Sequence, residues 1–313
     1  MVDWSPILLA KKELVYAQDA APTAEANAFL TRNFQRQPIV TDRLERNLDR
    51  PVRGGSPDAA TNARQTYSFE VEMAGSGAAG TAAPWMELHE ACGMLAPVLT
   101  AGATAIQKFA PIGVALSSLT SHSYIGTELA KSLGARGTFG WNITAGSYPF
   151  WNYEFTGLLP PPGSEIADAV PGEPDLDRWI DPLEVNTANT EFTLDGFALV
   201  MQSFTGAVNA EIATRNLVGA NYIRRGNHAI TGQIVGVATT ITAKNYYASL
   251  RSGAQTVLAF THGIVAGNIV GLDMAHVQIT AITVSNDGGE MMVTISYRAN
   301  VGTTNDDLII TVK

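Results

Sequence analysis

Tyr67-Ser68-Phe69-Glu70-Val71-Glu72-Met73 is the stretch that decides the fold. Apolar and polar residues alternate along it and the residues just before it, with Gln65, Ser68, Glu70 and Glu72 mostly on the polar side. This pattern is typical of an antiparallel strand with one face on a core and one face in water. A glycine-rich turn follows at 75–80. The next segment, 84–93, has Pro in its first turn and Gly after its last, which predicts a short helix. We expect two further strands around 134–138.

The second half of the chain repeats this order of elements. Its pattern predicts a strand at 229–237, a helix at 243–253 and strands at 277–284 and 290–299. Asn286-Asp287-Gly288-Gly289 is a strong hairpin signal. The repeat indicates an internal duplication. The expected fold class is mainly β, with two β-sandwich or barrel domains that each carry a short flanking helix.

Composition divides the chain into four segments. Residues 1–30 contain one short apolar run and then an Ala-, Pro- and Thr-rich stretch, which predicts an arm that orders against a partner rather than a strand with its own core. A first β domain is expected at 31–157 and a second at 190–313. Residues 158–189 are rich in proline and acidic side chains and lack any period, so they predict a linker or a large insertion.

Charge and cysteine content restrict the function. The chain has 313 residues, a formal net charge of −9 and a pI near 5.0, so its field should repel nucleic acid and anionic membranes. Its single cysteine, Cys92, excludes an intrachain disulfide framework. No stretch reaches the roughly 18 apolar residues of a membrane span, and the N-terminus does not resemble a signal peptide. We expect a soluble protein made inside a cell.

Motifs that could carry chemistry are weak. Gly75-Ser76-Gly77-Ala78-Ala79-Gly80 matches a dinucleotide-binding pattern, but the preceding strand carries Glu70 and Glu72, whereas a Rossmann first strand is apolar on both faces. His89 and Cys92 have the spacing of part of a zinc-deaminase site, which requires further cysteines that the chain lacks. The sequence therefore predicts no enzyme, with no catalytic residue, cofactor or metal site.

Two segments are candidates for self-association. The arm has too little local sequence to bury its large apolar side chains, so we expect them to lie on an adjacent subunit or ring. These residues are Trp4, Leu8, Leu9, Leu14 and Tyr16. Residues 41–58 mix both charge signs without a period and predict a long exposed loop. Its arginines are candidates for ring-to-ring ion pairs or, alternatively, for a solvated surface: Arg43, Arg46, Arg50 and Arg53.

Several of these segments occur in an order that points to one family. They are the run Leu8-Leu9-Ala10-Lys11-Lys12-Glu13-Leu14-Val15-Tyr16, the strand at 69–72 with its glycine turn, the helix at 83–93, and Leu133-Gly134-Ala135-Arg136-Gly137-Thr138. Together they resemble the major tail tube protein of long-tailed (siphovirus-like) bacteriophages. The resemblance implies tail-tube-like β domains whose copies close into rings, and rings that stack into a hollow tube. Residues 190–313 match less well, so a second tube domain depends on the internal repeat.

The resemblance also implies partners. With two tube domains per chain, three chains would complete a pseudo-sixfold ring. The other partners would be tape-measure, tail terminator and distal tail proteins, and genomic DNA would pass through the lumen without specific binding. The tube would belong to the virion tail and be assembled in the cytoplasm of the bacterial host. The alternative is a distal tail or tail-tip β-sandwich that binds a receptor or glycan, because such proteins share the fold.

Overall fold

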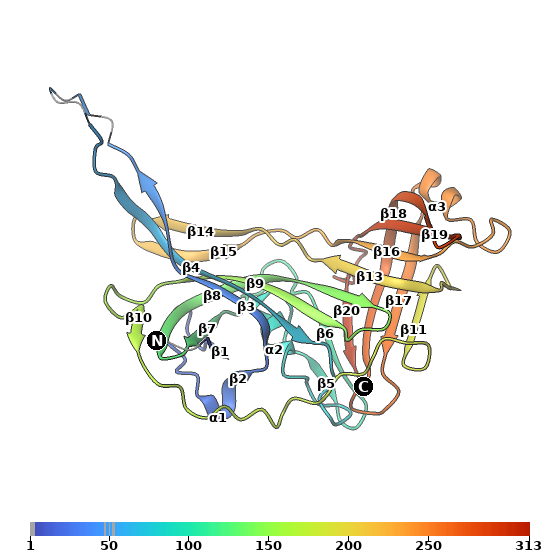
Figure 1. Ribbon diagram of the computed structural model, residues 1–313, viewed down its shortest axis with the longest axis horizontal. Helices are drawn as coiled ribbons and strands as arrows, with labels where there is room; N and C mark the ends of the chain where they lie inside the picture. Colours follow the sequence, from blue (N-terminus) through green and yellow to red (C-terminus); the bar gives the residue numbers. More distant parts are fainter. Residues whose placement is uncertain (1–3, 47, 50, 52–53) are drawn as a thin grey trace.

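The computed structural model describes residues 4–46, 48–49, 51 and 54–313, and the chain is mainly antiparallel β (Figure 1). The helices are α1 (Ala24–Asn27), α2 (Met86–Ala91) and α3 (Tyr246–Ser252). The strands of the first half are β1 (Pro6–Lys12), β2 (Ala28–Phe29), β3 (Arg32–Leu44), β4 (Ala59–Glu72), β5 (Val98–Thr100), β6 (Thr104–Lys108), β7 (Leu119–Ile125), β8 (Glu128–Thr144), β9 (Phe150–Leu158) and β10 (Ile166–Asp168). Those of the second half are β11 (Thr190–Leu194), β12 (Phe197–Ala198), β13 (Met201–Ala207), β14 (Ile212–Leu217), β15 (Ala220–Arg225), β16 (Thr231–Val237), β17 (Gln255–His262), β18 (Val270–Asp287), β19 (Glu290–Ala299) and β20 (Ile309–Val312).

The predicted mainly β class is confirmed, and most predicted elements are present. The strand at 67–73 is the end of β4, and the helices predicted at 84–93 and 243–253 are α2 and α3. The predicted turn at 286–289 joins β18 to β19, and its two glycines have φ values of 59° and 96°. Such left-handed positions favour glycine, which explains the turn signal.

The two halves have the same order of strand pairing. In the first half, antiparallel pairs give the order β1–β7–β8–β9–β4–β3. In the second half they give β11–β17–β18–β19–β16–β13. The short strands β2 and β12 pair with the first strand of each order. Each half also places its helix after the matching strand, α2 after β4 and α3 after β16.

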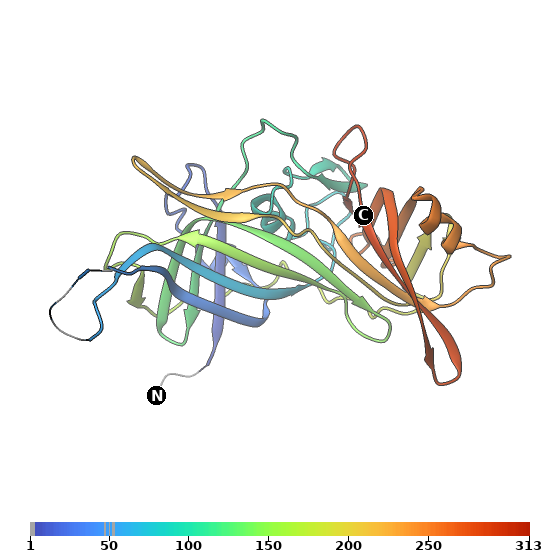
Figure 2. The ribbon, with the colours of Figure 1, turned by 90° about the horizontal axis from the view of Figure 1, so that it is seen from above.

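One pairing joins the halves into a continuous sheet. The end of β8 pairs with β13, from Thr144 opposite Ser203 to Gly140 opposite Ala207. The order β3–β4–β9–β8–β13–β16–β19–β18 is therefore uninterrupted, and it runs the length of the molecule (Figures 1 and 2). A second link is the pairing of β20 with both β6 and β18. One hydrophobic cluster contains residues of both halves, so the division into two domains stays a prediction.

The interpretation of residues 1–30 as an arm without a strand is wrong for 6–12. These residues form β1, which pairs along its length with β7 and at its centre with β2. Leu8 and Leu9 are only 1% and 2% exposed. The missing partner is β7, more than a hundred residues further along the chain, so local sequence did not reveal it.

Three further expectations need correction. The loop expected at 41–58 is shorter, because 41–44 continue β3 and β4 begins at Ala59, which makes a hairpin that projects from the body (Figure 1). The two strands expected around 134–138 are one long strand, β8, with a register shift between Leu133 and Arg136. Gln65, expected mostly on the wet face of its strand, is fully buried.

The glycine turn at 75–80 packs the halves together. The backbone N–H of Gly75 donates to Asn268 Oδ1 at 2.8 Å, and that of Gly77 donates to the Gly267 carbonyl at 2.9 Å. A Cβ on Gly75 would lie 2.0 Å from the Gly267 oxygen. Glycine is thus required for close backbone approach. Since α2 begins only at Met86, the turn does not open a helix as a dinucleotide site requires.

The helix α2 carries an unusual buried group. His89 is fully buried, stacks on Phe139 at 4.1 Å between ring centroids, and contacts Gln107 Oε1 through Nδ1 at 3.3 Å. Burial lowers the pKa of His89 to about 3, although the Gln107 contact opposes this. The folded protein therefore holds the imidazole neutral.

Acid sensitivity follows from this burial. Between pH 6.5 and about 3 the unfolded chain protonates His89 and the folded chain does not. The free energy of unfolding should therefore fall by about 1.4 kcal/mol per pH unit through this group as pH drops below 6.5. His89→Gln should lose this contribution, whereas the control His276→Gln, at a partly exposed histidine, should keep it. Urea unfolding at pH 7, 6 and 5 measures the slopes; equal slopes for wild type and H89Q would contradict the assignment.

Candidate self-association surface

The continuous sheet ends in two edges. β3 pairs only with β4, and the last part of β18, Ala281–Asp287, pairs only with β19, among the residues that the structure describes. An unpaired edge presents a row of backbone N–H and C=O groups that can pair with another chain. These edges are the first candidate surface for self-association.

The two edges correspond to strands that pair with each other inside the chain. In the shared strand order, β3 takes the place of β13, and β18 takes the place of β8. Trp141 of β8 lies opposite Trp151, and Val284 of β18 lies opposite Val293. The two positions match once the extra residue that β18 carries at its register shift after Ile279 is allowed for. Trp141 is 1% exposed where β13 lies beside it, whereas Val284 is 49% exposed. The open edge of β18 is therefore apolar, whereas the matching edge of β8 is covered by β13.

An apolar hollow extends this edge. It has a volume of about 210 Å³ and lies between residues 238–247 and the β18–β19 hairpin. Its lining includes Ile241 and Met291, each 55% exposed. The sequence did not single these residues out, because alternation predicts a strand but not which of its apolar side chains lacks a covering neighbour. The only available signal was the internal repeat, which places the buried Trp141 and the exposed Val284 at matching positions.

The residues predicted from the arm have different environments. Trp4 is 70% exposed and Leu14 fully exposed, whereas Leu8 and Leu9 lie in the core. Tyr16 contacts the second half of its own chain: its hydroxyl accepts from the Ile223 N–H at 2.7 Å, and Arg136 lies over its ring. Burial raises the pKa of Tyr16, partly opposed by the Ile223 hydrogen bond. The structure therefore leaves Trp4 and Leu14 available, while Leu8 and Leu9 stabilise the fold.

The predicted arginines lie on the projecting hairpin. Arg43 pairs with Asp58 across it at 3.3 Å, and both side chains are largely exposed. Arg46 is exposed near the tip. Arg50 and Arg53 fall outside the described residues. An exposed pair of this kind contributes about 0.2–1 kcal/mol, so Arg43 does little for the fold.

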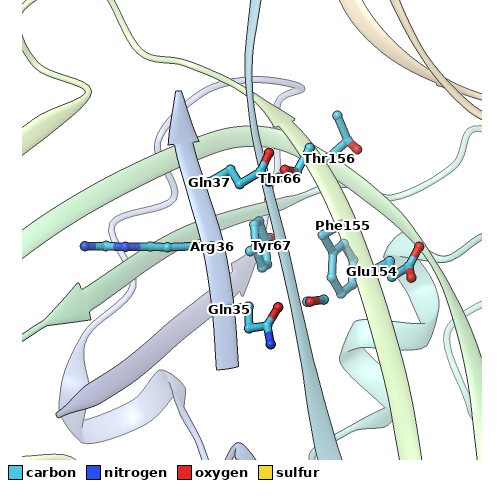
Figure 3. A pocket seen from close by; sticks show the side chains of 9 residues that line it. Gln35, Arg36, Gln37, Thr66, Tyr67, Glu154, Phe155 and Thr156 are labelled. Atoms are coloured by element: carbon cyan, nitrogen blue, oxygen red, sulfur yellow. The ribbon is translucent and has the colours of Figure 1, made fainter. Parts of the chain in front are cut away.

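The opposite face of the sheet is polar across both halves. Residues paired across strands share a face, and two rows of paired residues show that this face is polar. They are Gln35–Ser68–Glu154–Thr138 in the first half, and Asn142–Thr205–Gln233–Ser296 across the β8–β13 pairing and the second half. Figure 3 shows part of this face at an open hollow of about 410 Å³, where side chains of β3, β4 and β9 gather. Side-chain amides and hydroxyls dominate it.

Within the described part of the chain, no group of three or more His, Cys, Asp or Glu residues is placed to hold a metal ion. Among the helices formed by the described residues, none has the length and apolar character needed to cross a membrane.

A long antiparallel sheet with an open edge at each end is typical of β proteins that assemble with other copies through their edges. A family model described as phage tail tube protein matches residues 7–299 of this chain. The chain therefore belongs to the phage tail tube protein family and is a structural component of the virion tail, as the sequence resemblance indicated. No curated protein matched the sequence.

The contrast between Leu8 and Leu14 can be tested directly. Leu8→Ala should lower the free energy of unfolding by about 2–5 kcal/mol, because it removes a core side chain. Leu14→Ala should change it by less than about 0.5 kcal/mol, because Leu14 is fully exposed. Denaturant unfolding of the two variants measures this; equal losses would show that Leu8 is not a core residue.

Proposed function

We propose that this chain forms the phage tail tube as stacked rings of three chains. The observation that carries the proposal is the repeated strand order, joined through the β8–β13 pairing into one sheet with two open edges. If the halves arose by duplication, the β8–β13 pairing is the template for the contact between chains. β18 of one chain then pairs with β3 of the next, and three chains give six equivalent units in a pseudo-sixfold ring.

Closure of the ring removes the open edges. Edge strands left in water invite uncontrolled pairing, and closing a sheet on itself abolishes them. In this arrangement the exposed Val284 and Met291 gain a covering strand, as Trp141 already has inside the chain. The hydrophobic effect and the new backbone hydrogen bonds then act together to hold the ring.

The polar face would line the lumen. Its amides and hydroxyls offer no array of positive charges to hold phosphates, and the chain is acidic overall, with a net charge of −9. Duplex DNA would therefore pass through without specific binding. The rings would stack with help from Trp4 and Leu14, which are exposed. The expected neighbours are tape-measure, tail terminator and distal tail proteins, with assembly in the host cytoplasm.

The edge-pairing proposal has a matched pair of variants. Val284→Lys places a charge on the open edge of β18, whereas Val218→Lys places one at the fully exposed β14–β15 turn. Because Lys on an edge disfavours pairing, V284K should fold normally by circular dichroism but need at least about a tenfold higher concentration to assemble. V218K should assemble like wild type. Light scattering and negative-stain microscopy report assembly, and normal tubes from V284K would count against edge pairing.

A further inference from the structure

The β14–β15 hairpin of the second half lies across the first half. It leaves the sheet between β13 and β16, beside the β8–β13 joint. Arg136 Nη1 of β8 donates to the Ile223 carbonyl at 2.9 Å, and the Ile223 side chain is fully buried. The Arg225 guanidinium lies over Phe109, and it fills the space where a Cβ on Gly93 would be. The hairpin is thus a strap that binds the second half to the first.

The matching connection in the first half is the β3–β4 hairpin. It leaves the sheet between the strands that correspond to β13 and β16. Asp42 and Asn62 at its base line a small hollow together with Ile212 of β14, and its outer part projects from the body (Figures 1 and 2). Ile39 and Leu44 on it are 46% and 60% exposed. Its salt bridge between Arg43 and Asp58 is internal to the hairpin. The first half therefore carries a hairpin that leaves the sheet at the same place as the strap of the second half. The apolar side chains of this hairpin are exposed.

We infer that the strands of the β3–β4 hairpin at 39–44 and 59–62 lie across the second half of the neighbouring chain in the same ring. The inference rests on the proposed ring. The direction of the hairpin follows from the β8–β13 pairing inside the chain and from the hairpin that follows β13. There, β13 pairs with β8, and the hairpin that follows β13 covers the half that contains β8. Since β3 pairs with the neighbour's β18, its hairpin covers the half that contains that β18.

The surface on which the hairpin would lie can be located from residues that occupy matching positions in the two halves. Gly93 ends the helix α2 with φ 91°, and Gly253 ends α3 with φ 67°. Arg136 lies one residue beyond the register shift between β7 and β8, and Gln278 lies one residue beyond the shift between β17 and β18, so the two positions match. The Gln278 side chain donates to the Gly253 carbonyl at 3.3 Å. The hairpin therefore lies over the C-terminal end of α3 and the middle of β18.

Exposed groups around these positions suit the hairpin. Tyr247 of α3 is 42% exposed, and Val257 of β17 is 54% exposed. Arg251 of α3 is also exposed, as is Arg298 of β19, which lies opposite Gln278. The hairpin brings exposed apolar side chains together with charges of both signs. Asp42 and Asp58 are paired with Arg64 and Arg43, and Glu45, Arg46 and Asp49 are exposed. Burial of exposed apolar side chains on both surfaces would therefore stabilise this contact.

Photo-crosslinking distinguishes this arrangement from ring-to-ring stacking. Leu44 is replaced by p-benzoylphenylalanine, and assembled protein is separated into single rings and stacked tubes before irradiation and peptide mapping. We expect crosslinks between chains, already present in single rings, to peptides within residues 246–301. The same label at Ile112, a fully exposed residue of another loop, is the control and should not reach those peptides.

Other outcomes overturn the inference. Crosslinks that form only in stacked tubes would assign the hairpin to ring-to-ring contacts, and crosslinks in single rings to other segments would place it elsewhere. Rings that form without any crosslink from position 44 would also reject it while leaving the ring proposal intact. If the unlabelled protein forms neither rings nor tubes, the proposed function itself fails.

Discussion

The pairing of β8 with β13 is the interaction on which the rest of the structure depends. It joins two half-sheets into one and requires very close packing. A Cβ on Gly206 would lie 2.2 Å from the Trp141 ring, and a Cβ on Gly140 would lie 2.6 Å from the Gly206 carbonyl. Glycine on both strands lets the backbones meet while Trp141 fills the core beneath them. The hydrogen bonds of the joint and the burial of a large aromatic side chain thus stabilise the same place.

The β8–β13 pairing also explains why the sheet keeps two unpaired edges. A sheet built by adding one half to another retains one edge of each kind, here β3 and the end of β18. Edges of complementary kind on one molecule make a head-to-tail contact, which closes into a ring or continues as a filament. In the proposed ring the polar face would form the inner surface, and the projecting hairpin would make a second contact with the same neighbour. The strand pairing that joins the two halves inside the chain, repeated between chains, would thus account for the assembly.

The sequence predicted the local elements of this fold better than their partners. Alternation at 67–73 and the glycine turn at 286–289 determine strands and a hairpin through nearest-neighbour chemistry, and both were predicted correctly. Pairing between distant segments leaves no such local signal. Leu8 and Leu14 therefore could not be distinguished from the sequence, although pairing with β7 buries Leu8 and leaves Leu14 in water. For the same reason the candidate arginines were identified by charge, while the exposed Val284 was not identified at all.

Electron cryo-microscopy of assembled tubes would test the central claim, that the contact between chains repeats the contact between halves. The account predicts three chains per ring, with β3 of each chain paired to β18 of the next and with Gln35, Glu154 and Gln233 facing the lumen. A ring of six chains, or a ring of three in which the edges of β3 and β18 remain in solvent, would contradict it.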